Sequence, residues 1–337
     1  MGPMPKKKSL TLQRVLVLLL AYIMLAVCGG VAASVLFVPG VIGANKAAKA
    51  VIPSLKVENV DFDVTSLPQK STMYARDGST VIATFYNQNR IVVPLKKISK
   101  TMQQAVVARE DRRFWTHAGV DVQGVMRAFV QTYLVKGSQQ GGSSLTQQYV
   151  KNVLLMQAIE DDDSIAQYHA TEDTIARKIR EMLISVQMEK KYSKAEILQG
   201  YLNIAQFGNN LYGVETAAQR YFSVSAADLN VVQSATIAAI TKNPSLYDPL
   251  VEENQKESEN QRNIVLKLML QEGYITQKQY TEAVNTPLKD TLKAQDVNVG
   301  CQDTGDYAYF CDFVVHRIQN SEEFGKTRAE RNKLLQE

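Results

Sequence analysis

The sequence predicts a mainly α-helical protein with one short β-hairpin, preceded by a single transmembrane helix. Three observations support this fold class. An uncharged apolar run lies near the N-terminus, short alternating segments surround a turn at Asp77-Gly78, and helical spacing of apolar residues dominates after Pro94. With 337 residues, 45% hydrophobic and 21% charged, the chain can hold one large or two ordinary domains with real cores.

The apolar run near the N-terminus spans residues 15–38 and is long enough to cross a bilayer as one helix. Residues 1–14 carry Lys6, Lys7 and Lys8, so the positive-inside rule predicts a cytoplasmic tail. The rest of the chain is then expected outside the plasma membrane of a single-pass protein. A cleaved signal peptide is the alternative, but the run is longer than the usual h-region and lacks a clean small-x-small site at its end.

Residues 39–71 contain Pro39, Pro53 and Pro68 and show no sustained periodicity, which predicts a stalk between the membrane and the folded body. The next segment, residues 72–93, has the alternation of two or three short strands. Beyond these strands the sequence predicts helices.

The formal charge of +4 and a pI near 8.7 are only mildly basic, and no basic tract is interleaved with aromatic residues. Nucleic-acid binding is therefore not expected. The chain has three cysteines and three histidines, and no Cys-x-x-Cys motif. These are few candidate ligands for a zinc site, so no metal ligands are assigned. In oxidising surroundings Cys301 and Cys311 either form a short-loop disulfide or remain free thiols, and the sequence leaves both open.

Glu110 is the first candidate catalytic residue. Helical spacing from Ser99 through Met102 and Val106 puts it one turn further on the same buried face, at the end of a helix. Burial and the negative end of a helix both favour the protonated carboxyl group, so this glutamate is predicted to accept a proton near neutral pH. The alternative is a helix end followed by a charged, solvated turn.

Residues 141–152 read Gly-Gly-Ser-Ser-Leu-Thr-Gln-Gln-Tyr-Val-Lys-Asn and predict the start of another helix, capped by a serine. The free N–H groups of its first turn form an anion site. Gln147 and Lys151 lie four positions apart on one face, which suits a phosphate ligand. A capped helix with a surface lysine is the simpler alternative.

A third stretch opens a long helix at Arg177. Arg177 and Lys178 precede Glu181 by four and three positions, close enough on a helix to pair with it and keep it ionised. Two glutamates in contrasting environments are expected when carboxyl groups divide acid, base and electrostatic roles. The apolar stripe of this helix is predicted at helical spacing: Ile175, Ile179, Met182, Leu183 and Val186.

These stretches resemble the ordered motifs of the peptidoglycan glycosyltransferases, glycosyltransferase family 51, found in class A penicillin-binding proteins and monofunctional transglycosylases. The first two motifs are Glu-Asp-Arg-Arg-Phe-x-x-His-x-Gly-x-Asp from Glu110 and the glycine-rich stretch at 141–152. Arg-Lys-x-x-Glu follows from Arg177, then Lys-Ala-Glu-Ile-Leu from Lys194 with Tyr-Leu-Asn after it, and then Arg262 with a following Val-Leu.

The resemblance implies a function, the polymerisation of lipid II into peptidoglycan glycan strands. Glu110 matches the base that deprotonates the 4-hydroxyl of the incoming lipid II sugar, and undecaprenyl pyrophosphate leaves with inversion. Glu181 matches the second acidic residue, which acts on the leaving pyrophosphate directly or through a divalent cation, Mg or Mn. The resemblance also implies substrate-binding residues: Ser143, Gln147, Gln148, Lys151, Lys178, Arg180 and Arg262.

The implied fold is a lysozyme-like helical lobe with a smaller membrane-proximal lobe, over residues 72–290. Residues 291–337 lose strong periodicity and resemble the connector toward a transpeptidase domain. The chain holds no Ser-x-x-Lys and no Lys-Thr-Gly, so no transpeptidase activity is expected. The implied partners are lipid II, the growing lipid-linked strand, the membrane, moenomycin-type inhibitors and other cell-wall synthesis proteins.

Two segments depart from this pattern or leave alternatives open. An acidic insertion at residues 160–173 is longer than the family usually carries; it is expected to loop outward from a pyrophosphate site, with metal binding as the alternative. Apolar pairs in residues 125–134 form one wide helical face, which serves either as core or as a lipid-facing surface.

Two rival functions remain. A lysozyme-like glycan-cleaving enzyme would use Glu110 as a general acid, although cleavage of a neutral linkage needs no pyrophosphate clamp at Lys151. A non-catalytic, membrane-anchored cell-wall scaffold would not need Glu110 at all.

Overall fold

Helices form most of the part of the chain that the computed structural model describes, which is residues 68–129, 142–295, 299–301 and 304–336. The mainly α-helical class predicted from the sequence is confirmed for these ranges. The predicted tail, the transmembrane segment at 15–38 and nearly all of the stalk lie outside the described residues. Within the described ranges, no helix has the length and apolar character needed to cross a bilayer.

The helices between the hairpin and the end of the body follow in sequence order: α2 (Lys100–Glu110), α3 (Val122–Phe129), α4 (Leu145–Glu160), α5 (Ser164–Thr171), α6 (Ile175–Lys191), α7 (Lys194–Ile204), α8 (Val214–Phe222), α9 (Val231–Ile240), α10 (Gln255–Gln271), α11 (Gln277–Asn285) and α12 (Leu288–Thr291). Short 3-10 turns connect some of them: Leu95–Lys97, Ala226–Asp228 and Glu252–Asn254.

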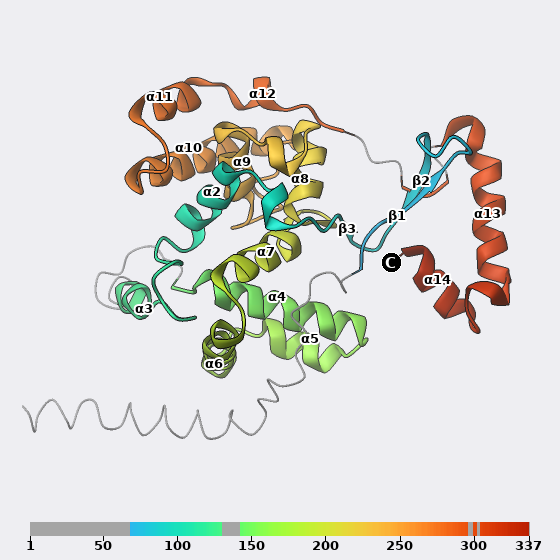
Figure 1. Cartoon of the computed structure of the whole chain (residues 1–337), viewed down its shortest axis with the longest axis horizontal. Coiled ribbons are helices and arrows are strands. Elements are labelled where there is room, and N and C mark those ends of the chain that lie inside the picture. Colours follow the sequence, from blue (N-terminus) through green and yellow to red (C-terminus); the bar gives the residue numbers. More distant parts are fainter. Residues whose placement is uncertain (1–67, 130–141, 296–298, 302–303, 337) are drawn as a thin grey trace, which may run out of the picture. The chain divides into compact units, whose positions relative to one another are not determined.

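Two groups of helices make up this body (Figure 1). In the first group, α9 packs between α2 and α10, and its residues from Ser234 to Ile240 are all buried. This run of small and apolar residues therefore lies in the core. In the second group, α4 packs against α5, α6 and α7. Each group buries the apolar faces of its helices, which supplies the hydrophobic driving force for the fold.

The β structure divides into two small sheets. The hairpin is confirmed, with β1 (Ser71–Tyr74) antiparallel to β2 (Val81–Phe85), and the Asp77 carboxylate accepts the backbone N–H groups of Ser79 and Thr80 in its turn. The third predicted strand does not join this hairpin. Instead, β3 (Asn89–Arg90) pairs with β5 (Leu211–Tyr212), which also pairs with β4 (Gln206–Gly208).

Local capping signals explain several helix ends. Capping boxes of Ser193 with Glu196 and of Thr276 with Gln279 start α7 and α11. Gly273 has a φ of +70°, a left-handed conformation that glycine adopts without steric cost, just beyond the end of α10. This glycine therefore allows the chain to leave the helix.

The apolar stripe predicted for α6 does not form the fully buried face of that helix. Ile175 is 79% exposed, and the other members of the apolar stripe are only partly buried. The helix instead buries Arg177, Glu181 and Ser185 together with two apolar residues. Periodicity marks an apolar face, but α6 turns a polar face inward because its ion pairs satisfy the charges there.

The acidic insertion is not the outward loop that the sequence predicts. It forms α5, which packs against α4. Asp161, Asp162 and Asp163 are exposed in the turn before α5, and the Asp163 carboxylate accepts the backbone N–H groups of the first turn of that helix. These carboxylates therefore act as solvated turn and cap residues.

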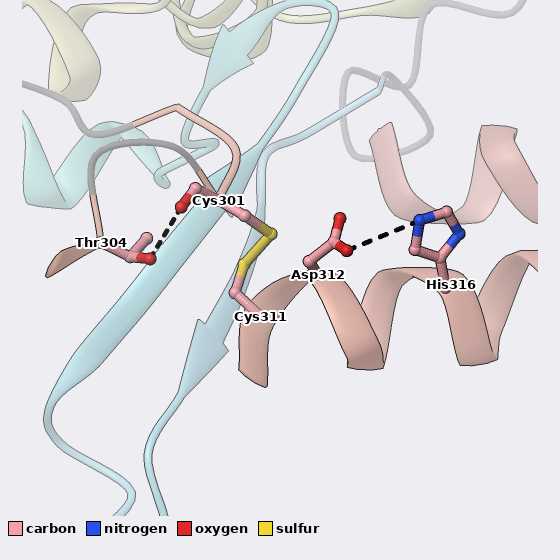
Figure 2. Close-up of a disulfide and its surroundings, with 5 residues drawn as sticks. All are labelled: Cys301, Thr304, Cys311, Asp312 and His316. Atoms are coloured by element: carbon pink, nitrogen blue, oxygen red, sulfur yellow. Dashed lines mark hydrogen bonds and ion pairs between the residues drawn. A yellow bond between two sulfur atoms is a disulfide. The ribbon is translucent and has the colours of Figure 1, made fainter. Parts of the chain in front are cut away.

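Residues after 298 return to the hairpin. Gly300 donates its N–H to the carbonyl of Thr84 at 2.9 Å, and Cys311 is buried against Ile82 and Ala83 of β2. Cys301 and Cys311 form a disulfide with 5.5 Å between their Cα atoms, so the first of the two sequence-level alternatives is confirmed (Figure 2). The disulfide joins the loop to the start of α13 (Ala308–Asn320).

The described part of this C-terminal segment is helical, in contrast to the predicted loss of periodicity. Helix α13 packs against α14 (Arg328–Gln336), and short 3-10 turns at Gly305–Tyr307 and Glu322–Phe324 flank α13. Large apolar side chains of α13 are exposed at Tyr309 and Phe313. Because its apolar residues are not all on the buried side, the sequence gives only a weak helical signal.

The apolar face predicted at residues 125–134 is described only in its first half. In α3, Val122 is 67% exposed and Met126 is 57% exposed. Residues 130–141 lie outside the described ranges. The choice between a core face and a lipid-facing surface therefore stays a prediction.

Candidate active site

Glu110 is the last residue of α2, and both of its carboxylate oxygens have a hydrogen-bond donor. Gln148 Nε2 donates to Oε2 at 2.8 Å, and Thr241 Oγ1 lies 2.7 Å from Oε1. The side chain is partly buried, at the negative end of its helix. The residue expected on the buried face thus lies at the edge of that face, where its carboxylate is held in one orientation.

The second contact of Gln148 is with Tyr201, a buried residue of α7. Tyr201 donates its hydroxyl to Gln148 Oε1 at 3.3 Å. Burial and the negative charge of Glu110 raise the pKa of the Tyr201 hydroxyl well above its usual value. Tyr201 therefore remains a protonated donor, and it fixes which end of the Gln148 amide faces Glu110.

Helix α4, which carries Gln148, starts at a capping box. Ser144 accepts the N–H of Gln147, and the Gln147 side chain accepts the N–H of Ser144. Ser144 Oγ also donates to the carbonyl of Gly119 at 2.6 Å. Gly119 has a φ of +85°, and a Cβ there would lie 2.7 Å from the backbone carbonyl of Ser185, so only glycine fits this approach to α6.

A buried network, absent from the sequence-level site, holds the start of α4 against the loop after α2. Asp111 Oδ2 accepts the backbone N–H of Leu145 at 2.9 Å and lies 2.7 Å from His117 Nε2. Lys194 Nζ lies 3.4 Å from His117 Nδ1 and donates to Glu189 Oε1 at 2.7 Å. Asp111, His117 and Lys194 all belong to the motifs quoted above, and that membership was the signal that could have found them.

Glu181 is buried in α6 and paired with two cations, as the sequence predicts. Its Oε1 accepts a hydrogen bond from the Arg177 guanidinium, and its Oε2 lies 3.3 Å from Lys178 Nζ. Lys178 Nζ also donates to Ser143 Oγ at 3.1 Å. The structure therefore brings Ser143, Lys178 and Glu181 together between the start of α4 and α6.

Lys151 lies in the electrostatic field of the same group. Burial lowers the pKa of the Lys151 ammonium; the negative charge of Glu181 opposes this shift, and the positive charges of Arg177 and Lys178 add to it. Lys151 makes no hydrogen bond or ion pair with any residue that the structure describes. Gln148 and Lys151 are three positions apart on α4, so one helix face links the surroundings of Glu110 to those of Glu181.

The remaining substrate-binding candidates have different environments. Gln147 is fully buried, and its Nε2 has no partner in the described ranges. Arg180 has a buried Nε that likewise has no described partner. Arg262 is fully buried in α10, donates to the carbonyl of Thr286 at 2.8 Å and pairs with Glu259, so the structure places it in the packing of α10 with the end of α11 and not beside Glu110.

A divalent cation held by the protein alone does not fit the described residues. Both oxygens of Glu181 are engaged by cationic side chains. Over the described ranges, no group of three or more His, Cys, Asp or Glu side chains is arranged to hold a metal ion. No step of the chemistry is therefore assigned to a metal.

The sequence comparisons identify the class of this protein. A family model described as transglycosylase matches residues 78–270, which is more than half of the chain. The protein belongs to this family, the transglycosylase domain of class A penicillin-binding proteins. The match includes every stretch that supplies the site described above.

Individual relatives are much longer than this chain. It is 38% identical to penicillin-binding protein 4 of Bacillus subtilis over 272 residues, 80% of this chain and 40% of that protein. It is 39% identical to penicillin-binding protein 1A of Aquifex aeolicus over 229 residues, 68% of this chain and 29% of that protein. An alignment with a crystal structure of penicillin-binding protein 1A from Haemophilus influenzae covers 76% of this chain and 26% of the other at 24% identity, with a TM-score of 0.40, which is too low to establish a common fold.

Proposed function

We propose that this protein polymerises lipid II into peptidoglycan glycan strands by inverting glycosyl transfer and releases undecaprenyl pyrophosphate. One observation carries the proposal. On helix α4, Gln148 donates a hydrogen bond to the carboxylate of Glu110, and Lys151, one turn later, lies near enough to Glu181 for the two charges to interact. One rigid helix face thus carries both Gln148, which holds the proton acceptor Glu110 of α2, and the cationic Lys151. Glycosyl transfer from a pyrophosphate donor requires both groups at one site.

In the proposed reaction, Glu110 accepts the proton of the 4-hydroxyl group of the acceptor sugar. The oxygen then attacks the anomeric carbon of the lipid-linked donor strand, and the bond from that carbon to the pyrophosphate oxygen breaks. The α linkage of the donor becomes β in a single displacement, without a covalent enzyme intermediate. Because Gln148 and Thr241 hold both oxygens of Glu110, the carboxylate is oriented before the substrate arrives.

The leaving pyrophosphate carries the negative charge that develops in this step. Lys151, Lys178 and Arg180 supply positive charge for it, with the hydroxyl of Ser143 next to Lys178. Glu181 does not itself bind the leaving group directly in this proposal; its two ion pairs hold Arg177 and Lys178 in place. The fixed cations stabilise the departing charge without reorganisation at the moment of reaction.

We further propose that the protein is anchored in the plasma membrane by residues 15–38, with its N-terminus in the cytoplasm and the catalytic body outside. A lipid-linked substrate requires a site that is reached from the bilayer. The exposed apolar residues Val122 and Met126 of α3 fit that requirement. Other cell-wall synthesis proteins and moenomycin-type inhibitors are the further partners that we propose.

The experiment is polymerisation of labelled lipid II by the purified full chain in detergent, with wild-type protein and Glu110→Gln. The amide is isosteric but cannot accept the proton, so the rate should fall by a factor of at least about 100 while the circular dichroism spectrum stays unchanged. Glu282→Gln, an exposed change on α11, is the control and should retain full activity. Moenomycin should inhibit the wild-type protein.

The products separate this proposal from its rivals. Elongation of strands from lipid II supports synthesis, whereas shortening of preformed peptidoglycan without elongation would indicate a glycan-cleaving enzyme. Full activity of Glu110→Gln, or no polymerisation by any variant, would indicate a scaffold or another chemistry. Each outcome is visible on one gel of labelled glycan products.

A further inference from the structure

Thr241 contacts Glu110, although it belongs to none of the motifs that identify the site. It follows the last residue of α9. Its Oγ1 lies 2.7 Å from Glu110 Oε1 and 2.8 Å from the carbonyl oxygen of Ala238. A hydroxyl group has one proton, so Thr241 cannot donate to both acceptors at once.

The two partners of Glu110 differ in what they can do when the carboxylate takes up a proton. Gln148 reaches Oε2 with its amide nitrogen, which donates hydrogen bonds and accepts none. Its orientation is fixed because its carbonyl oxygen accepts the hydroxyl of Tyr201. Thr241 is different, because a hydroxyl group both donates and accepts.

We propose that Thr241 is a positioning residue that holds the carboxyl group of Glu110 in the same place before and after proton transfer; this inference rests on the proposed role of Glu110 as the base. While Glu110 is ionised, Thr241 donates its proton to Oε1. Once the carboxyl carries a proton on Oε1, that O–H donates to Thr241, whose own proton turns to the carbonyl of Ala238. No covalent bond of Thr241 changes in this exchange.

The surroundings of Thr241 favour such an exchange. Burial raises the pKa of the Tyr201 hydroxyl, so Tyr201 stays protonated and keeps donating to Gln148 while the protons at Thr241 and Glu110 change. Two side chains, Gln148 of α4 and Thr241 at the end of α9, contact the carboxyl group of Glu110 of α2, and Tyr201 of α7 holds Gln148. Because each comes from a different helix, the packing of the body fixes the arrangement, and only the hydroxyl protons need to move.

The test compares Thr241→Val, Thr241→Ser and the matched control Thr236→Val in lipid II polymerisation by the full chain. Valine keeps the shape of threonine but can neither donate nor accept. Thr236 is buried in α9 and donates to the carbonyl of Val232 at 2.9 Å, so its replacement also removes one hydroxyl-to-helix bond, at a distance from Glu110. It controls for any general effect on α9.

For Thr241→Val we expect kcat to fall about tenfold, the effect of losing roughly one hydrogen bond in the transition state, with KM within about twofold of wild type. Thr241→Ser should restore kcat to within about threefold, because serine returns the hydroxyl group. Thr236→Val should match wild type. This split between kcat and KM, with rescue by serine, is not expected from a purely structural role.

The inference is overturned if Thr241→Val keeps the wild-type kcat, if it loses activity no more than Thr236→Val, or if serine fails to rescue it. Failure of the proposed function itself would give different results: the wild-type chain would not extend strands, or Glu110→Gln would remain active. The role of Thr241 would then also be ruled out. If the wild-type chain is active and Glu110→Gln is inactive, the Thr241 variants alone decide whether Thr241 is a positioning residue.

Discussion

His117 Nε2 lies 2.7 Å from Oδ2 of Asp111, and the same carboxylate oxygen accepts the backbone N–H of Leu145 at the start of α4. Both side chains are buried. Removing the carboxylate therefore leaves a backbone donor and a histidine without their partner. We expect Asp111→Ala to lower the free energy of unfolding by about 2–4 kcal/mol, measured by denaturant titration.

The control for this change is Asp173→Ala. That side chain is fully exposed, and its carboxylate makes only a long contact, 4.0 Å, with an Arg177 nitrogen. The substitution should alter the free energy of unfolding by less than about 0.5 kcal/mol. Equal effects of the two variants would show that Asp111 does not hold α4 in place. A large effect at Asp111 alone supports the structural role of the first motif.

The two cations beside Glu181 are expected to act differently. Arg177 is buried with Glu181, so Arg177→Met leaves a buried carboxylate short of its main partner and should cost about 3 kcal/mol of stability. The Lys178 side chain is 38% exposed, so Lys178→Met should cost about 1 kcal/mol or less. Because Lys178 is the proposed contact for the pyrophosphate, this variant should nevertheless lose polymerisation activity.

Thermal unfolding and lipid II polymerisation, measured on both variants, check this separation. Lys178→Arg, which keeps the positive charge, is the matched variant and should retain more activity than Lys178→Met. If Lys178→Met polymerises at the wild-type rate, the lysine does not contribute to the leaving-group site.

Much of the site was predictable because its residues lie at fixed spacings on single helices. The pairing of Arg177 and Lys178 with Glu181 follows from positions three and four apart, and the structure confirms it. The serine cap before Leu145 followed from its position at the end of a glycine-rich stretch. Contacts within one helix turn need no knowledge of the tertiary fold.

Contacts between distant segments were not predictable in the same way. Thr241 reaches Glu110 across 131 residues of sequence, and nothing in its local pattern marks it. Strand β3 pairs with β5 and not with the adjacent hairpin. Strand pairing of this kind depends on tertiary packing, which the local sequence does not show. The apolar stripe of α6 did not indicate its buried face, because charge pairing and not apolar spacing decides which face of that helix is buried.

The lowered pKa of Lys151 gives a prediction about pH. An ammonium group is charged below its pKa, and burial lowers that pKa from 10.5, so Lys151 loses its charge at a lower pH than an exposed lysine does. The alkaline fall in polymerisation rate should therefore begin below the range in which ordinary lysines titrate. Lys151→Arg stays charged throughout and should remove this fall, at some cost in rate at neutral pH.

The measurement is the pH profile of kcat/KM from neutral pH upward for both proteins, with circular dichroism at each pH to exclude unfolding. Identical alkaline limbs would mean that Lys151 does not carry the charge on which catalysis depends. If the alkaline limb of Lys151→Arg lies at higher pH than that of the wild type, the titration belongs to Lys151.

The disulfide between Cys301 and Cys311 should stabilise the contact between the C-terminal segment and the hairpin, and not the catalytic body. It closes a loop between positions ten apart, for which the chain-entropy estimate is about 2–3 kcal/mol. Cys301→Ser with Cys311→Ser should therefore increase hydrogen exchange in β2 and at the start of α13. Exchange in α4 and the polymerisation rate should stay at wild-type levels, because neither Glu110 nor Glu181 contacts this segment in the described residues. Loss of polymerisation with unchanged exchange in β2 would contradict the prediction.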